Sequence, residues 1–259
     1  MPSSSGSTTE LRARLRAGEV VVGTFLNLGS AVAAEICGLA GFDWVLIDLE
    51  HGSGSEADLL PQLQALAHTG AAPIVRVESN ERPRFARALD SGAVGVMVPR
   101  VDTAEEAGAA AASMRYPPIG VRGTAYMNRA AGWGARSGAE VTAFNERVVG
   151  VIQIESETAV ANVEEIAAVE GVDVLFIGPS DLTQSMGILG QTDDPRFLAA
   201  VQAVADAARA AGKATGILVQ APEQLDRYLE LGFQLVAVGS DSSFLAGTAR
   251  RTLELARAR

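Results

Sequence analysis

Acidic side chains follow three apolar segments of the sequence, at the point where each segment ends. Glu155 closes a run that begins at Val148, and Asp181 follows the run from Val172 to Ile177. A third run ends in Asp48-Leu49-Glu50-His51. If these runs are parallel strands of an α/β barrel, their carboxyl ends meet at one rim, where such barrels build active sites. Two carboxylates with room for water suit a hard divalent cation, so Glu155 and Asp181 are predicted metal ligands.

These acids also have a simpler interpretation. Ser180 or Asp181 could cap the helix that follows its strand, and Glu155 could do the same for the next helix. Their shared position at two consecutive strand ends favours a metal site. Gln153 lies two residues before Glu155 and therefore on the same face of the strand. It could donate to a substrate oxygen, or it could form a hydrogen bond inside the barrel.

His51 is a candidate catalytic residue. It is one of two histidines in the chain, and Asp48 and Glu50 lie beside it. A carboxylate bound to the imidazole would fix its tautomer and raise its basicity. A structural role is the alternative for any single histidine. The second histidine, His68, lies near the end of a predicted helix and is interpreted as a structural residue.

Arginines at strand ends supply fixed positive charge. Arg76 ends an apolar run, and its fork of donors suits a carboxylate or an enolate oxygen beside a metal; a strand-end salt bridge is the alternative. Arg100 ends the next run and Arg122 lies in a Gly-Val-Arg-Gly turn. For both, a site role and a structural role stay open.

The scarce residue types exclude several chemistries. The only lysine, Lys213, precedes a predicted strand and so lies at the wrong end for a Schiff-base aldolase. Carbon–carbon bond cleavage would therefore need a metal and Arg76 to stabilise an enolate. The only cysteine, Cys37, is interpreted as a buried structural thiol, and a zinc site of several His or Cys ligands cannot be built.

The elements that must position these residues alternate along the whole chain, which predicts a single-domain (β/α)8 TIM barrel over residues 11–259 after a disordered tail at 1–10. The expected strands are 20–26, 44–49, 72–77, 95–99, 148–154, 172–177, 214–219 and 235–239. The expected helices are 32–40, 55–69, 81–91, 103–114, 157–169, 196–211, 222–231 and 243–257. One interval, 116–146, is too long for a simple connection and is therefore a candidate functional insertion.

Composition limits the partners. The formal net charge of −10 argues against a nucleic-acid-binding face. No secretory signal and no apolar run long enough for a membrane span is visible, and one cysteine fits a reducing compartment. We therefore expect a cytoplasmic protein whose partners are small molecules and copies of itself.

Five motifs resemble, in order, those of the class II pyruvate aldolases of the HpcH/HpaI family, of the 4-hydroxy-2-oxoheptanedioate and 2-dehydro-3-deoxyglucarate aldolase type. The resemblance covers roughly residues 20–255. The motifs are Asp48-x-Glu50-His51, Val75-Arg76-Val77, Tyr116-Pro117-Pro118-x-Gly120-Val121-Arg122-Gly123, Gln153-Ile154-Glu155 and Gly178-Pro179-Ser180-Asp181-Leu182.

The resemblance implies a role for most of these residues. Glu155 and Asp181 would hold Mg²⁺, Mn²⁺ or Co²⁺, which would also bind pyruvate. Arg76 would stabilise the enolate, and His51 paired with Asp48 would be the general base. The pyruvate-binding residues would be Gln153, Gly178, Pro179, Ser180 and Asp181. Asp90 would reach the histidine of a neighbouring subunit, although it could instead be an ordinary solvated helix residue.

The resemblance also implies the reaction and the assembly. The enzyme would reversibly cleave 4-hydroxy-2-oxo acids to pyruvate and an aldehyde, in a homohexamer built as a trimer of dimers with the last helix exchanged. A CoA-thioester lyase, an oxaloacetate decarboxylase and a non-catalytic keto-acid-binding barrel are the rival functions. Leu49 replaces a frequent glycine and is expected to narrow the mouth. Segments 124–133 and 190–192 are atypical and are expected to face the aldehyde.

Overall fold

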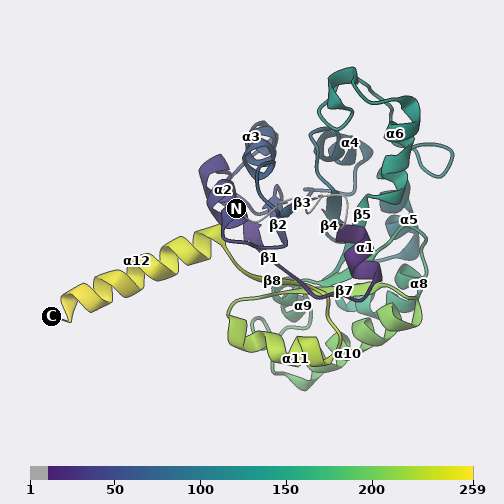
Figure 1. Ribbon diagram of the computed structural model, residues 1–259. Coiled ribbons are helices and arrows are strands. Elements are labelled where there is room, and N and C mark those ends of the chain that lie inside the picture. The colour runs from purple at the N-terminus through teal and green to yellow at the C-terminus, as the bar shows by residue number, and fades with distance from the viewer. Residues whose placement is uncertain (1–10, 259) are drawn as a thin grey trace.

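Eight parallel strands close into a barrel in chain order, which confirms the predicted fold (Figure 1). The computed structural model describes residues 11–258. Every predicted strand is present and ends within two residues of its expected limits. The strands are β1 (Val21–Leu26), β2 (Trp44–Asp48), β3 (Ala72–Arg76), β4 (Gly95–Val98), β5 (Val149–Ile154), β6 (Val174–Ile177), β7 (Ala214–Val219) and β8 (Leu235–Ser240).

The helices surround this barrel. Those that the alternation predicted are α2 (Ala31–Leu39), α3 (Glu56–Leu66), α4 (Arg82–Asp90), α5 (Ala104–Ser113), α7 (Glu157–Ala161), α8 (Val163–Ala167), α10 (Pro195–Ala210), α11 (Leu225–Glu230) and α12 (Asp241–Arg257). The expected helix 157–169 is thus two short helices that meet at Asn162. Elements that were not predicted are α1 (Leu11–Arg16), η1 (Gly132–Gly134), α6 (Gly138–Thr142), η2 (Ala143–Glu146), α9 (Pro179–Ser185) and η3 (Pro222–Gln224).

The barrel has two hydrophobic layers, as strands covered on both faces require. The outer layer joins the strands to the helices. The inner layer contains an aromatic group in which Phe25 contacts Trp44 and Phe176, with ring centroids 6.5 Å and 6.1 Å apart. Gly23 makes room for this group, because a Cβ there would lie 2.3 Å from the Trp44 ring. The interior is therefore a packed core that supports the strand ends from below.

Helix α1 closes the amino-terminal end of the barrel. Leu11 and Leu15 are buried in the inner core. Between them, Arg12 is also buried, and its Nε donates to Asp173 at 2.8 Å. An apolar plug and a buried ion pair therefore close the barrel interior at this end, and the interior is open at the carboxyl ends of the strands.

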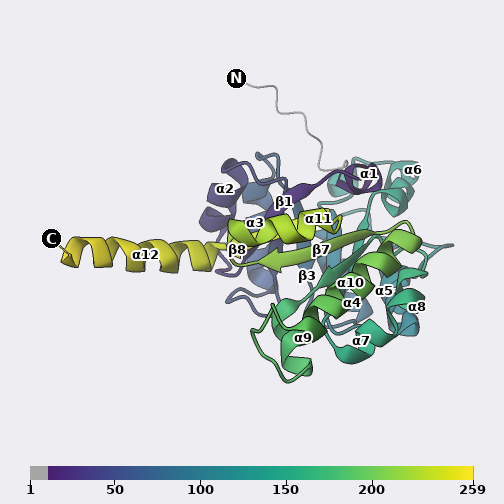
Figure 2. The same cartoon turned by 90° about the horizontal axis from the view of Figure 1, so that it is seen from below.

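Helix α12 leaves the barrel and projects away from it, as both ribbon views show (Figure 2). Phe244 near its start stacks on Phe42, with ring centroids 6.4 Å apart. Farther along, Leu245, Leu253 and Leu255 are exposed. Exchange of this helix between subunits stays a prediction for the single chain. Within residues 11–258, no helix has both the length and the apolarity to span a membrane. The predicted tail at 1–10 lies outside the described residues.

Candidate active site

A cavity of about 220 Å³ opens at the carboxyl ends of the strands. Its lining includes every residue predicted to bind substrate, together with Arg76 and His51. The lining residues are Phe25, Asn27, His51, Arg76, Gln153, Phe176, Gly178, Pro179, Ser180, Asp181, Leu218, Gln220, Gly239 and Ser240. Seven of the eight strands contribute through their ends or the residues that follow, so the fold brings the sequence motifs to one place.

Several polar contacts hold the Arg76 side chain at the wall of this cavity. It ends β3 opposite Asp48, its register partner at the end of β2. The guanidinium donates to both oxygens of Asp48, with Nε–Oδ1 at 2.9 Å and Nη2–Oδ2 at 2.7 Å. Nη1 lies 3.3 Å from Glu50 Oε2 and 3.5 Å from Gln153 Oε1. Such a bidentate pair fixes the plane of the guanidinium, so Arg76 presents a rigid positive charge to the cavity.

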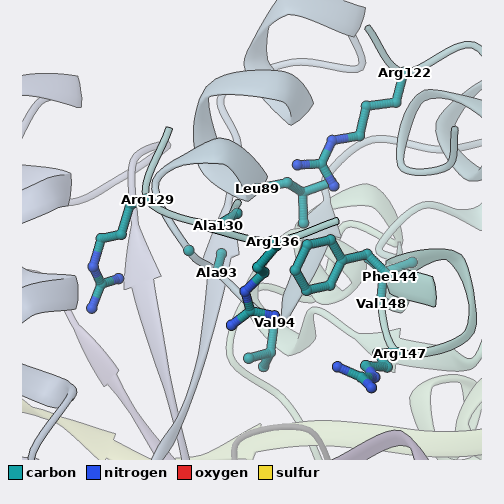
Figure 3. A pocket seen from close by; sticks show the side chains of 11 residues that line it. Leu89, Ala93, Val94, Arg122, Arg129, Ala130, Arg136, Phe144, Arg147 and Val148 are labelled. Atoms are coloured by element: carbon teal, nitrogen blue, oxygen red, sulfur yellow. The ribbon is translucent and has the colours of Figure 1, made fainter. Parts of the chain in front are cut away.

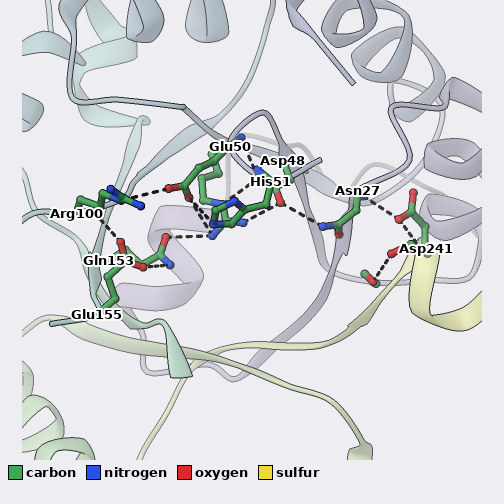
Figure 4. Close-up of polar contacts among 11 residues, drawn as sticks. Asn27, Asp48, Glu50, His51, Arg100, Gln153, Glu155 and Asp241 are labelled. Carbon is green, nitrogen blue, oxygen red and sulfur yellow. Dashed lines mark hydrogen bonds and ion pairs between the residues drawn. The ribbon is translucent and has the colours of Figure 1, made fainter. Parts of the chain in front are cut away.

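Glu155 is a buried carboxylate next to Gln153, which lines the cavity (Figure 4). Its Oε1 accepts the backbone N–H of Arg100 at 2.7 Å, and its Oε2 accepts the amide of Gln153. Burial raises the pKa of Glu155 to about 7; the N–H of Arg100 opposes this shift, while the charges of Asp181 and Glu50 add to it. The positive groups near Glu155 therefore do not offset the cost of burying its ionised carboxylate.

A divalent cation would supply the missing positive charge. Asp181 lies close enough for its charge to act on Glu155, and its carboxylate has no hydrogen-bond or ion-pair partner within residues 11–258. Two hard oxygen donors with water and substrate completing the shell are the ligand set that Mg²⁺ takes. The described residues contain no cluster of three or more His, Cys, Asp or Glu placed for a metal. Glu155 and Asp181 therefore suit the predicted cation.

Gly178 leaves the space that this arrangement needs. A Cβ there would lie 2.8 Å from both Gln153 Nε2 and Glu155 Oε2. We expect Gly178→Ala to displace the Glu155 carboxylate and to lower kcat about 10-fold to 100-fold, since small misplacements at a reacting centre have effects of that size. The matched control is Gly70→Ala, where a Cβ meets nothing within 4 Å. Steady-state kinetics of the two variants test this, and equal activities would contradict the steric role.

His51 lines the cavity but does not pair with Asp48 as the resemblance implied. Its Nε2 lies 3.7 Å from Glu50 Oε2, and its side chain is 53% exposed. Asp48 instead accepts the backbone N–H groups of Glu50 and His51, at 3.1 Å and 3.2 Å. The two Asp48 oxygens are occupied by Arg76, so the acid that can orient the imidazole is Glu50.

Asp90 lies away from the cavity of its own chain. It ends α4 just before β4 begins and therefore sits at the amino-terminal ends of the strands. Its Oδ1 accepts from Arg122 Nη2 at 2.6 Å. Arg122 is thus a structural partner of Asp90 within the chain. The role of Asp90 at the site of a neighbouring subunit stays a prediction.

Two expectations about the mouth are wrong for the single chain. Leu49 packs in the outer core and does not line the cavity, because it points toward the helices. In segment 124–133, Arg129 and Ala130 lie at the opposite end of the barrel, where Ala130 N–H donates to the Asp90 carbonyl and Arg129 to that of Ser91. The segment joins a helix to a strand, and such connections lie at the amino-terminal face.

Sequence reasoning missed Asn27 and left the roles of Glu50 and Arg100 undetermined. Asn27, just after β1, donates to Asp48 Oδ2 at 3.2 Å, and its own N–H binds Asp241 Oδ1 at 2.8 Å. Glu50 contacts Arg76, and burial raises its pKa while Arg76 opposes the shift. Arg100 acts through its backbone N–H, in a left-handed conformation with φ 54°. The only signal for Asn27 was its place directly after a strand.

Comparison with known proteins extends this picture. The family model described as HpcH/HpaI aldolase/citrate lyase matches residues 22–247. A 5-keto-4-deoxy-D-glucarate aldolase of Salmonella arizonae is 42% identical over 240 residues, which are 92% of this chain and 93% of the relative. A 2-dehydro-3,6-dideoxy-6-sulfogluconate aldolase of Pseudomonas putida is 44% identical over 232 residues, 90% of this chain and 91% of the relative.

A solved structure agrees with these relatives. A HpcH/HpaI aldolase/citrate lyase family protein from Burkholderia cenocepacia superimposes with a TM-score of 0.92 at 40% identity. The superposition covers 96% of this chain and 99% of the other. The similarity therefore spans the whole barrel, including all the strand ends that carry the site.

Proposed function

The chain belongs to the HpcH/HpaI aldolase/citrate lyase family, and from this premise we propose the role of each site residue in aldol cleavage. It is a carbon–carbon lyase, a class II aldolase that cleaves 4-hydroxy-2-oxo acids reversibly to pyruvate and an aldehyde. The roles of individual residues, the bound metal, the range of aldehydes and the assembly are the proposals that follow.

The observation that carries the assignment is the fixed guanidinium of Arg76 at the wall of the cavity. Cleavage between C3 and C4 leaves an electron pair on the three-carbon fragment, whose charge collects on the C2 oxygen as an enolate. Donors already aimed at developing charge lower the barrier without reorganising. Asp48 holds Arg76 in place before substrate arrives, so Arg76 can take this role.

The metal would be held by Glu155 and Asp181, with Gln153 orienting Glu155 through its amide. When bound, a divalent cation such as Mg²⁺, Mn²⁺ or Co²⁺ supplies a Lewis acid for the 2-oxo group. Residues 178–180 would contact the carboxylate end of the substrate, because they line the cavity beside Asp181.

His51 would remove the proton from the C4 hydroxyl. The O–H electrons then form the aldehyde carbonyl, the C3–C4 bond breaks, and its electrons pass into the enolate. Protonation of C3 completes pyruvate. Glu50, 3.7 Å from the imidazole, would stabilise the protonated His51. An exposed imidazole near a carboxylate can exchange its proton with solvent after each turnover.

The rest of the cavity lining indicates which aldehydes the site prefers. Gln220 and Ser240 bring polar groups to a wall that also contains Leu218. The two relatives described above are named for acidic, hydroxylated keto acids. We therefore propose that hydroxylated aldehydes are preferred over purely apolar ones, since their hydroxyl groups can satisfy these polar side chains.

The assembly is proposed to be a homohexamer, a trimer of dimers with α12 exchanged. Support comes from the exposed leucines of α12, whose apolar side chains have no partner within residues 11–258. A cytoplasmic location also stays a prediction.

The two histidines offer a matched test of the function. We expect His51→Asn to lower kcat for aldol cleavage about 100-fold to 10,000-fold, the range for loss of a general base. His68→Asn, at the opposite end of the barrel, should keep full activity. Pyruvate release from a panel of 4-hydroxy-2-oxo acids, measured with Mg²⁺ or Mn²⁺ and a coupled dehydrogenase, gives both values.

Two results would contradict this assignment. Cleavage of CoA thioesters or decarboxylation of oxaloacetate, with no turnover of any 4-hydroxy-2-oxo acid, would place the chain with the rival lyases. Equal rates in the two histidine variants would remove His51 from the mechanism while leaving the aldolase activity itself intact.

A further inference from the structure

A second cavity, of about 290 Å³, is lined by the side chains that Figure 3 draws and lies at the end of the barrel opposite to the active site. Val94, which precedes β4, and Val148, which precedes β5, form part of its wall. The active-site residues Arg100 and Glu155 follow the far ends of the same two strands. The cavity is therefore separate from the aldolase site of its own chain, and none of the proposed catalytic steps uses it.

The charge of this second cavity is unusual for the chain. Its lining contains four arginines, Arg122, Arg129, Arg136 and Arg147, and no Asp or Glu. The whole protein has a formal net charge of −10. An arginine cluster in an acidic protein is not explained by composition, and like charges held together repel one another unless an anion offsets them.

Within residues 11–258, the two inner arginines, Arg122 and Arg129, have too few hydrogen-bond and ion-pair partners for their guanidinium groups. Arg122 is buried and pairs with Asp90 through Nη2, but its Nε is buried without a hydrogen-bond partner in the described part of the chain. Among the residues that the structure describes, Arg129 donates only to the backbone carbonyls of Ser91 and Leu63. Burial lowers the pKa of Arg129, and no acid between residues 11 and 258 opposes that shift.

The two outer arginines are exposed at the rim. Neither Arg136 nor Arg147 forms an ion pair with any residue from 11 to 258. Arg136 lies over the ring of Phe144 at 5.1 Å. Glu140 is near enough to respond to both charges, but its carboxylate is already bound by the backbone and hydroxyl of Ser137. The rim guanidinia are therefore available to a ligand.

We propose that this cavity binds a small organic molecule with two or more negative charges, a phosphate ester or a dicarboxylate. The guanidinia offer forked donors of the kind that bind phosphate and carboxylate groups. Leu89, Val94, Phe144 and Val148 provide an apolar wall for the carbon chain. The volume is near the lower limit of small-molecule pockets, about 300 Å³, so the ligand is small.

The test is calorimetric titration of the full chain with three probes: inorganic phosphate, glycerol phosphate and succinate. A chelator is present throughout, so that no probe binds through a metal at the aldolase site. The variant is the double substitution Arg136→Gln/Arg147→Gln. The control is Arg209→Gln/Arg227→Gln, which removes the same charge from two exposed arginines in surface ion pairs elsewhere.

We expect saturable binding of glycerol phosphate or succinate at one site per chain, with inorganic phosphate weaker because it leaves the apolar wall uncovered. The rim variant should weaken this binding at least about tenfold, since charged donors form the stronger hydrogen bonds. The control should bind as the unaltered protein does. A preference for glycerol phosphate or for succinate identifies the ligand as a phosphate ester or a dicarboxylate.

Binding that is equal in the rim variant and the control would overturn the proposal, and so would the absence of saturable binding by all three probes. The rim side chains are exposed, so the variant should fold, and its thermal unfolding curve verifies this. If it does not fold, Arg147→Gln alone is measured by the same criterion. Aldolase activity is not part of the readout, so failure here leaves the proposed function untouched.

Discussion

Replacing Arg76 by Lys is expected to lower kcat for aldol cleavage at least about 100-fold, the effect of losing one preorganised donor at an oxyanion. A lysine ammonium cannot make the two parallel bonds that Arg76 makes to Asp48 and also face the cavity. The positive charge remains, so the Asp48 carboxylate, whose side chain is fully buried, is not left without a cation. Steady-state assay of pyruvate formation measures the change.

The matched control for this substitution is Arg12→Lys. Arg12 is also a buried arginine, and it pairs with Asp173 at the sealed end of the barrel. We expect the control to change stability without a comparable change in kcat, because Asp173 lies far from the rim. Similar kcat values for Arg76→Lys and the unaltered protein would exclude Arg76 as the enolate-stabilising group.

Glu155→Gln should abolish metal-dependent activity and weaken Mn²⁺ binding at least about 100-fold, since even outer partners of metal ligands contribute 10-fold to 100-fold. The amide has the same shape as the carboxylate and can still accept the N–H of Arg100. Because Glu155 is buried beside other acids, removing its charge should not destabilise the metal-free protein. Titration of Mn²⁺ followed by electron paramagnetic resonance measures the affinity.

Glu106→Gln is the control for the loss of one acidic side chain. Glu106 caps α5 by accepting the N–H groups of Asp102 and Thr103 and lies on the exposed surface. It should bind Mn²⁺ as the unaltered protein does. If Glu155→Gln retained normal Mn²⁺ affinity, the metal would have to be bound elsewhere, and the assignment of Glu155 and Asp181 would be wrong.

The fold could be predicted from the sequence because each barrel strand is covered on both faces. Such a strand is a short unbroken apolar run, and its ends are marked by the first polar residues. The predicted run 214–219 coincides with β7 for that reason. Short elements gave no such signal. Helix α1 buries only Leu11, Arg12 and Leu15, and its role as a plug depends on contacts with distant strands.

The location of the site could also be predicted from the sequence, whereas the acid–base pairs within it could not. Strand ends gather at one rim whatever the register, so Asp48, Arg76, Glu155 and Asp181 were correctly placed together. Which acid meets which base depends on the register of β2 and β3, where Asp48 lies opposite Arg76. In that register Asp48 pairs with Arg76, and Glu50 is the acid that lies beside His51. The spacing of these residues along the chain does not show this pairing.

The arginine-lined cavity is a second feature that the sequence alone could not predict. Arg122 was noted because it lies in a recognisable turn, but Arg129, Arg136 and Arg147 belong to an irregular segment with no periodic pattern. Their convergence depends on how residues 116–147 fold back over the amino-terminal ends of β4 and β5. The length of this insertion alone predicted that it has a function. The chemistry of its arginines could be recognised only from the three-dimensional arrangement.

The central claim is that this site forms the enolate of pyruvate with the help of a divalent cation and Arg76. Exchange of the pyruvate methyl protons in D₂O, followed by nuclear magnetic resonance, measures that step without knowledge of the aldehyde. We predict exchange with Mg²⁺ or Mn²⁺ that is lost on chelation and lost in Arg76→Lys. No exchange with any divalent cation, or exchange that persists after chelation, would contradict the claim.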